Sequence, residues 1–128
     1  MAYGENAGKS GVVYILREMD NHHKLGKRKT HLFKIGESTR SGKTRAIELT
    51  EEAREKGSNV SYEFITESRT QDCYGSEQLV FKRLEEFRLG SFGEWGGHEL
   101  FEFIDDHQLK NAIKVIRETC VEVDNKLY

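Results

Sequence analysis

Two short runs of alternating apolar residues constrain the fold of this chain more than any other feature. They span residues 11–17 and 31–37, and the first run is largely apolar on both of its faces. Alternation with a period of two is typical of a β-strand, and a strand that is apolar on both faces belongs in the middle of a sheet. The polar connection at 18–30 allows the two runs to pair as an antiparallel hairpin with a long loop. The sequence therefore predicts a sheet built around the first run.

The remaining elements follow in an order that is typical of an α/β protein. Periodicity and end signals predict a helix at 43–56, a strand at 59–66, a helix at 70–88, a short strand or turn at 98–103 and a C-terminal helix at 106–122. The order β-β-α-β-α plus a short strand and a C-terminal helix predicts an α/β sandwich, with a three-stranded antiparallel sheet flanked by helices.

Length and local composition predict the domain organisation. Residues 1–10 are small and polar, and we expect them to form a flexible N-terminus. Residues 11–128 are expected to form a single domain with one core.

Composition argues against a membrane protein and against a disulfide-rich one. Charged residues make up 33% of the chain, and no run approaches the ~20 apolar residues that span a bilayer. The N-terminus lacks the layout of a secretory signal peptide. Cys73 and Cys120 have no metal-site spacing and suggest no disulfide framework, so we expect reduced thiols. These features predict a cytoplasmic protein without membrane contact.

The net charge of −2 hides a strong asymmetry. From Lys24 to Arg45 the chain has eight basic residues and one acidic residue, a net charge of +7. The rest carries 12 basic and 21 acidic residues, a net charge of −9. A basic stripe on an acidic body can attract a polyanion such as DNA locally. A solvated, lysine-rich hairpin loop explains the same pattern, and charge alone does not decide between the two interpretations.

Glu77 is the most informative single residue for chemistry. It falls in the middle of the apolar stripe that Val80, Phe81 and Leu84 form on the helix predicted at 70–88. An unpaired carboxylate there would be costly, so Glu77 needs a cation. A lysine or arginine would complete an ordinary salt bridge. A hard metal ion such as Mg²⁺, which accepts one or two protein carboxylates and keeps most of its waters, would make Glu77 a metal ligand.

Three other side chains each have an ordinary interpretation and a chemical one. Tyr14 would ordinarily pack in the core, but Lys34 can lie on the same sheet face and favour a phenolate that acts as a general base. Lys34 would otherwise be an exposed strand residue. Arg45 would ordinarily be a surface residue, but it lies in the first helical turn, where the dipole does not favour a cation, and its fork can hold two phosphate oxygens. Gly36 would let a phosphate approach the backbone closely.

These residues occur in an order that carries a family resemblance. The matching features are Tyr14, the triplet Lys34-Ile35-Gly36, Arg45 with Leu49, Glu77 with Leu84, the pair Phe87-Arg88 and the acidic-aromatic segment at 99–101. Together they resemble the GIY-YIG nuclease superfamily, and within it the small phage-type branch in which KIG replaces YIG. The resemblance covers about residues 11–103, and two features depart from it. The loop between the first two strands is long, and the asparagine found late in many relatives is not evident.

The resemblance implies a metal-dependent DNA endonuclease that hydrolyses phosphodiester bonds and is encoded by a phage or a mobile element. Its location would then be the host-cell cytoplasm. Tyr14, Arg45 and Glu77 would be catalytic, with Lys34 at the place of the family's second tyrosine. Glu77 would be the ligand of Mg²⁺ (or Mn²⁺).

The late asparagine of the family has two candidate replacements. Only His98 and Glu99 lie near its place in this sequence, so either could be an accessory site residue.

Basic and aromatic side chains outside the catalytic set are expected to bind DNA. They are Lys27, Arg28, Lys29, Arg40, Lys43 and Trp95. One such site cuts one strand, so a monomer should nick DNA, whereas a homodimer could cut both strands. The alternative is a catalytically inactive module of the GIY-YIG fold that binds DNA or a protein.

Overall fold

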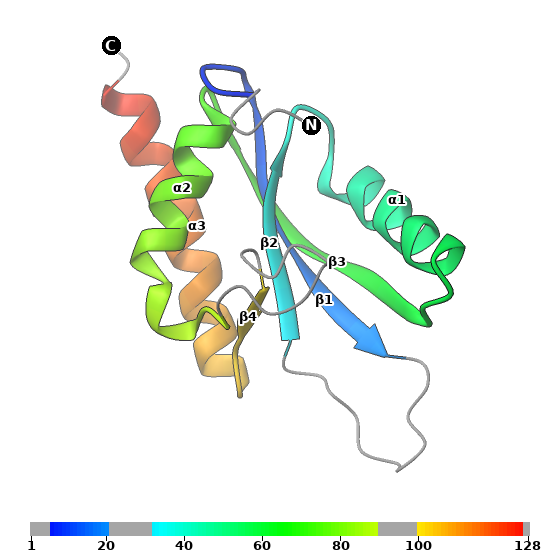
Figure 1. The fold of residues 1–128 in the computed structure, drawn as a ribbon. Helices are drawn as coiled ribbons and strands as arrows, with labels where there is room; N and C mark the ends of the chain where they lie inside the picture. Colours follow the sequence, from blue (N-terminus) through cyan, green and yellow to red (C-terminus); the bar gives the residue numbers. More distant parts are fainter. Residues whose placement is uncertain (1–5, 21–31, 90–99, 127–128) are drawn as a thin grey trace.

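The computed structural model describes residues 6–20, 32–89 and 100–126. Its elements are β1 (Gly11–Asp20), β2 (Leu32–Ser38), α1 (Gly42–Glu55), β3 (Val60–Thr70), α2 (Cys73–Arg83), the 3₁₀ helix η1 (Glu85–Phe87), β4 (Leu100–Glu102) and α3 (Asp106–Lys126). The strands form one twisted sheet with α1 on one side and α2 and α3 on the other (Figure 1). The α/β class predicted from the sequence is confirmed.

The sheet contains four antiparallel strands in the order β3-β1-β2-β4, so the prediction of three strands is wrong. The predicted hairpin of β1 and β2 is confirmed, with Tyr14 opposite Gly36 and Leu16 opposite Lys34. The additional strand is β4, whose three residues pair with the beginning of β2. The sequence predicted a short strand or turn at 98–103 but did not place it in the sheet, because so short a segment carries no signal for its pairing partner.

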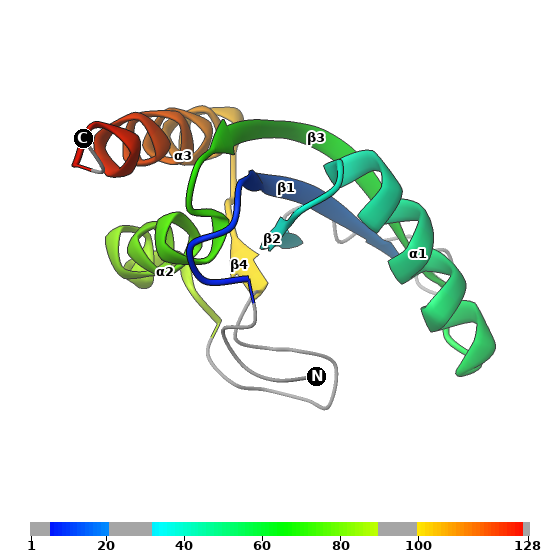
Figure 2. The same cartoon turned by 90° about the horizontal axis from the view of Figure 1, so that it is seen from above.

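Alternating side chains of β1 divide the core into two parts. Val13 and Ile15 pack on the side of the sheet that α2 and α3 cover. Val12, Tyr14 and Leu16 pack on the opposite side, beneath α1. Figure 2 shows these two layers of helix on either side of the curved sheet. All five side chains are at most 2% exposed, which confirms that β1 is a central strand.

Side-chain caps set the beginnings of α1 and α2. Ser41 Oγ accepts the N–H of Thr44 at 3.1 Å, and Asp72 Oδ1 accepts the N–H of Gly75 at 3.0 Å. A helix start at residue 70 was expected and is wrong, because β3 continues to Thr70 before the Asp72 cap. The helix also ends earlier than residue 88, and the 3₁₀ turn η1 follows it.

The C-terminal helix is longer than the range 106–122 expected from sequence. Asp105 caps it as predicted, since Asp105 Oδ1 accepts the N–H of Gln108 at 2.8 Å. Its last turns are tied to the end of β3, where Asp124 Oδ1 accepts from Thr70 Oγ1 at 2.8 Å. This anchor explains why α3 continues to Lys126. Within the described ranges, no helix combines the length and the apolar character needed to cross a bilayer.

The residues just before β1 also contact the domain. Asn6 Nδ2 donates to Glu37 Oε1 at 2.9 Å, and Lys9 O accepts the N–H of Cys73 at 2.9 Å. These bonds do not measure flexibility, so the division into 1–10 and 11–128 stays a prediction. Cys73 and Cys120 are both free and buried, in agreement with the expected reduced thiols.

Candidate functional site

The centre of the candidate site is the phenol of Tyr14, which lies across Gly36. A Cβ atom added at Gly36 would be 2.4 Å from the Tyr14 hydroxyl oxygen and 2.7 Å from Cζ. The ring therefore extends from β1 over the backbone of β2, and only a residue without a side chain allows this. Gly36 was expected to admit a phosphate to the backbone, but the space above it is filled by Tyr14.

The first turn of α1 lies directly over Tyr14. A Cβ at Gly42, the first residue of α1, would be 2.7 Å from Tyr14 Cβ. The N–H of Gly42 donates to Glu67 Oε1 at 2.7 Å, so a carboxylate from β3 anchors the positive end of the helix. Glu67 pairs directly opposite Tyr14, which puts Gly36, Tyr14 and Glu67 in one row across three strands.

Glu67 is a site residue that the sequence did not reveal. Simple alternation from Phe64 would put Glu67 on the other face of the sheet. A register shift opposite Ile15 and Leu16 changes the phase of β3 and turns Glu67 toward α1. No residue in the segment signals this bulge, so pattern analysis could not have found it.

Arg45 connects Tyr14 to the exposed surface of α1. Its guanidinium hydrogen-bonds the Tyr14 hydroxyl and also donates from Nη1 to Glu48 Oε1 at 2.7 Å. Burial alone lowers the pKa of Arg45, but the bonds and attraction to Glu48 and Tyr14 outweigh burial and raise it above its ordinary value. The structure therefore brings Tyr14 and Arg45 together.

Glu48 holds a second arginine as well. Arg40 donates from Nη1 to Glu48 Oε2 at 2.5 Å and from Nη2 to Glu48 Oε1 at 2.9 Å. The side chains of Arg40, Arg45 and Glu48 are 57%, 26% and 32% exposed. The hydrogen bonds from Arg40 and then Arg45 lower the pKa of Glu48, so it is ionised at neutral pH. Two guanidiniums thus share one carboxylate at the edge of the site.

Lys34 lies on the same face of the sheet as Tyr14. It pairs opposite Leu16 on β1 and opposite Leu100 on β4. Its residue is only 7% exposed, which excludes the ordinary interpretation as an exposed strand lysine. Lys34 is thus a second basic residue, two positions from Gly36, on the side of the sheet that carries Arg45.

Glu77 comes from the other layer of the domain. It is 5% exposed on α2, which agrees with its predicted place in the buried stripe, and its Oε1 accepts from Gln78 Nε2 at 2.9 Å. Because α2 and α1 cover opposite faces of the sheet, Glu77 can approach the Tyr14–Arg45 pair only around the outer edge of β2. Within the described residues, β4 pairs with β2 only as far as Lys34 and leaves the edge at Gly36 uncovered by a strand.

A comparison with known families identifies the domain. The T5orf172 domain matches residues 11–118, which is most of the 128-residue chain and every element from β1 into α3. The chain belongs to the T5orf172 domain family. T5orf172 is a phage-associated domain related to nucleases of the GIY-YIG and HNH-like kinds, which indicates a nuclease-like or DNA-binding function. No curated protein and no solved structure matches the chain.

The T5orf172 match also bears on partners. The family indicates an interaction with nucleic acid, whereas a homodimer has no support from this single chain. Of the residues expected to bind DNA, Arg40 lies in the turn before α1 and Lys43 in the first turn of α1. Lys43 Nζ is 5.8 Å from the centroid of the Phe64 ring. The other expected DNA-binding residues (Lys27, Arg28, Lys29 and Trp95) and the accessory candidates His98 and Glu99 lie outside the described residues.

A metal site in this T5orf172 domain would have few protein ligands. In the part of the chain that the structure describes, no three His, Cys, Asp or Glu side chains form a metal-binding group. A Mg²⁺ site that retains most of its waters requires only one or two carboxylates. Glu77 fits such a site, because it is a buried hard-oxygen donor oriented by a hydrogen bond from Gln78.

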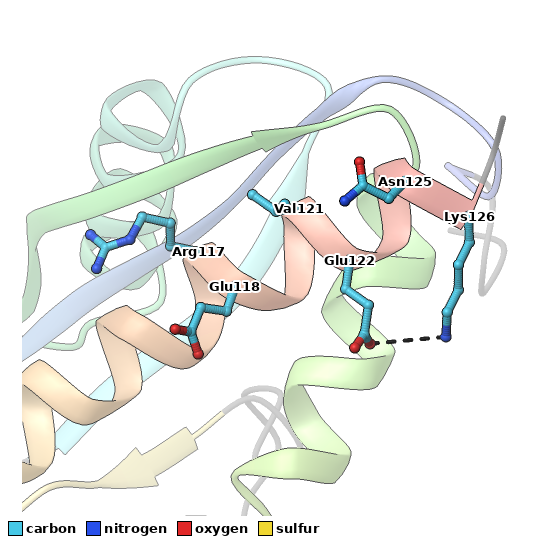
Figure 3. Close-up of a pocket in the computed structure, with 6 residues that line it drawn as sticks. All are labelled: Arg117, Glu118, Val121, Glu122, Asn125 and Lys126. Atoms are coloured by element: carbon cyan, nitrogen blue, oxygen red, sulfur yellow. Dashed lines mark ion pairs between the residues drawn. The ribbon is translucent and has the colours of Figure 1, made fainter.

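A hollow of this T5orf172 domain lies on the face of the sheet opposite Tyr14. It has a volume of about 560 Å³ on the outer face of α3 (Figure 3). Its lining residues are Arg117, Glu118, Val121, Glu122, Asn125 and Lys126. Glu122 and Lys126 form an ion pair there at 4.0 Å, and Val121 is an exposed apolar residue. The hollow contains no nucleophile or buried charge and has no evident link to the Tyr14 site.

Proposed function

We propose that this T5orf172 protein is a metal-dependent DNA endonuclease of the GIY-YIG type, from the small phage-type branch, that hydrolyses phosphodiester bonds. The observation that carries the proposal is the hydrogen bond between Arg45 and the buried Tyr14 hydroxyl. A tyrosine needs help to lose its proton at neutral pH, and a guanidinium against the hydroxyl provides it. The phage association of the family supports an origin in a phage or mobile element.

Tyr14 acts in this proposal as the general base. Its phenolate accepts a proton from water as the water oxygen attacks phosphorus. The P–O bond to the leaving sugar oxygen breaks, and that oxygen takes a proton from a second water molecule. Arg45 first stabilises the phenolate and then the negative charge that develops on the phosphate oxygens. Lys34, buried on the same face, contributes a further positive charge.

Glu77 holds Mg²⁺ or Mn²⁺ in this proposal. When bound, the ion supplies Lewis-acid stabilisation of charge on the phosphate. Glu77 contributes a single carboxylate from the far layer, so the phosphate and water would supply the other ligands.

Arg40 and Lys43 bind the DNA backbone next to the site, with help from Lys27, Arg28, Lys29 and Trp95. One site of this kind cuts one strand. We therefore expect the monomer to nick, and double-strand cutting to require a homodimer.

The experiment compares conversion of supercoiled plasmid to open-circle DNA by the wild type and by Glu77→Gln, with and without Mg²⁺. Glu86→Gln is the matched control, because Glu86 is an exposed glutamate just after the same helix. Nicking that requires Mg²⁺, is lost in Glu77→Gln and is retained in Glu86→Gln supports the proposal. Equal nicking by both variants contradicts it.

The second candidate function is an inactive GIY-YIG-fold module that binds DNA or a protein. It is favoured by one observation, that Glu77 belongs to α2 on the face opposite Tyr14 and Arg45. DNA binding that is independent of Mg²⁺, together with no nicking by the wild type over long incubation, supports this candidate over the nuclease.

A further inference from the structure

The shared carboxylate of Glu48 has the features of an anion that occupies a binding site. Its two oxygens receive three N–H donors, at 2.5 and 2.9 Å from Arg40 and at 2.7 Å from Arg45. A phosphodiester likewise has one negative charge and two terminal oxygens, and guanidinium forks bind both groups with the same geometry.

Contacts other than Glu48 fix the backbone of Arg40 and the side chain of Arg45. The backbone N–H of Arg40 donates to the buried Ser38 Oγ at 2.9 Å, which fixes the turn after β2. Arg45 is fixed by the first turn of α1 and by its bond to Tyr14. Loss of Glu48 would therefore leave the backbone of Arg40 and the side chain of Arg45 in place and would free the Arg40 guanidinium for another anion.

We propose that Arg40 and Arg45 form a phosphodiester-binding site and that the Glu48 carboxylate occupies it until a DNA phosphate replaces it. Glu48 is thus an internal competitor of DNA for the two guanidiniums. This inference rests on the DNA-binding part of the proposed function. Because Arg45 also contacts Tyr14, the exchange brings the incoming phosphate next to the phenol.

The exposure of the three side chains makes such an exchange feasible. Surface ion pairs are weak because water screens them, and a freed Glu48 would extend into solvent instead of remaining as a buried charge. A phosphate on a polyanion also releases counterions when it binds, which the intramolecular carboxylate does not.

Charge on the rest of α1 limits where DNA can lie. Arg45 and Glu48 line one end of a hollow of about 450 Å³ whose other walls are Glu51, Glu52 and Glu55. These carboxylates repel a DNA backbone from the C-terminal half of α1. DNA is therefore directed to the beginning of the helix, where Arg40 and Arg45 are.

The test measures binding of a short fluorescein-labelled DNA duplex by anisotropy in EDTA, over a series of KCl concentrations. Glu48→Gln should bind the duplex about 5-fold or more tightly than the wild type. The slope of log association constant against log [KCl] should be steeper by about 0.9 to 1.8, because one or two more guanidiniums contact phosphates. Glu51→Gln is the control, because it removes one charge from the same hollow without releasing an arginine, and its affinity should change less than about 2-fold. Arg40→Ala in the Glu48→Gln background should remove most of the gain.

Equal affinities of Glu48→Gln and Glu51→Gln, or weaker binding by Glu48→Gln, would overturn the inference. Thermal unfolding of each variant identifies a loss of fold, and Glu48→Asp, which keeps the charge but shortens its reach, gives a second variant that should also bind more tightly. EDTA prevents cleavage, so the outcome does not depend on nuclease activity. Tighter binding without any nicking in Mg²⁺ would preserve this inference while rejecting the proposed nuclease.

Discussion

The hydroxyl oxygen of Tyr14 lies 2.4 Å from the position that a Cβ atom would take at Gly36. The Tyr14 ring on β1 therefore occupies the space that a side chain at residue 36 on β2 would need. The ring in turn carries the hydroxyl that Arg45 contacts. The glycine therefore determines where the phenol can be.

Gly36→Ala should displace the Tyr14 ring and destabilise the protein by about 1–3 kcal/mol, since the extra methyl group cannot fit without movement. Urea unfolding measures this cost. In a Tyr14→Ala background the same substitution should cost little, because the ring is absent. If Gly36→Ala lowers the free energy of unfolding equally in both backgrounds, the contact between Tyr14 and Gly36 is not the cause of the loss.

Glu67→Ala should destabilise the protein by about 1–2 kcal/mol, because it removes the acceptor of the Gly42 N–H at the start of α1. Glu63→Ala is the control on the same strand, since Glu63 is 58% exposed and lies 3.7 Å from Arg17. Its substitution should cost less than about 0.5 kcal/mol. Urea unfolding that gives similar values for both variants would contradict the anchoring role of Glu67.

The sequence could predict the parts of the site that depend on local pattern. Alternation in β1 identified a central strand with Tyr14 inside it, and the apolar stripe of α2 identified Glu77 as buried, because both patterns report which side of an element faces the core. The pairing of Arg45 with Glu48 is also local, since residues three apart on a helix are neighbours.

The other parts depend on contacts between distant segments. The bulge that turns Glu67 toward α1 arises from the pairing of β3 with β1. The alternation of apolar and polar residues that precedes the bulge does not reveal it. Arg40 meets Glu48 only because the turn after β2 brings the chain back along α1. The three residues of β4 become a strand only because β2 offers an open edge.

Alkaline pH should destabilise the protein partly through its two thiols. Burial, and then the neighbouring Glu37, raise the pKa of Cys73 from 9.0 to about 12, and burial raises the pKa of Cys120 to about 11. Above pH ~9 the unfolded chain loses these protons while the folded protein keeps them, so the free energy of unfolding falls until the folded thiols ionise near pH 11 to 12. Each thiol contributes less than about 1.4 kcal/mol per pH unit.

Urea unfolding between pH 8 and pH 10.5 measures this effect. The double variant Cys73→Ala/Cys120→Ala is the comparison, and its stability should fall less steeply with pH than that of the wild type. Parallel curves for the two proteins would show that the thiols do not contribute.

The central claim is that the Tyr14 hydroxyl held by Arg45 performs the chemistry of DNA cleavage. Its most direct test is the rate of plasmid nicking in Mg²⁺ by Tyr14→Phe, beside Tyr62→Phe, which removes a hydroxyl from β3 on the same side of the sheet. We expect Tyr14→Phe to nick about 100-fold or more slowly than the wild type, with DNA affinity unchanged, and Tyr62→Phe to retain the wild-type rate. Nicking by Tyr14→Phe at the wild-type rate would contradict the claim.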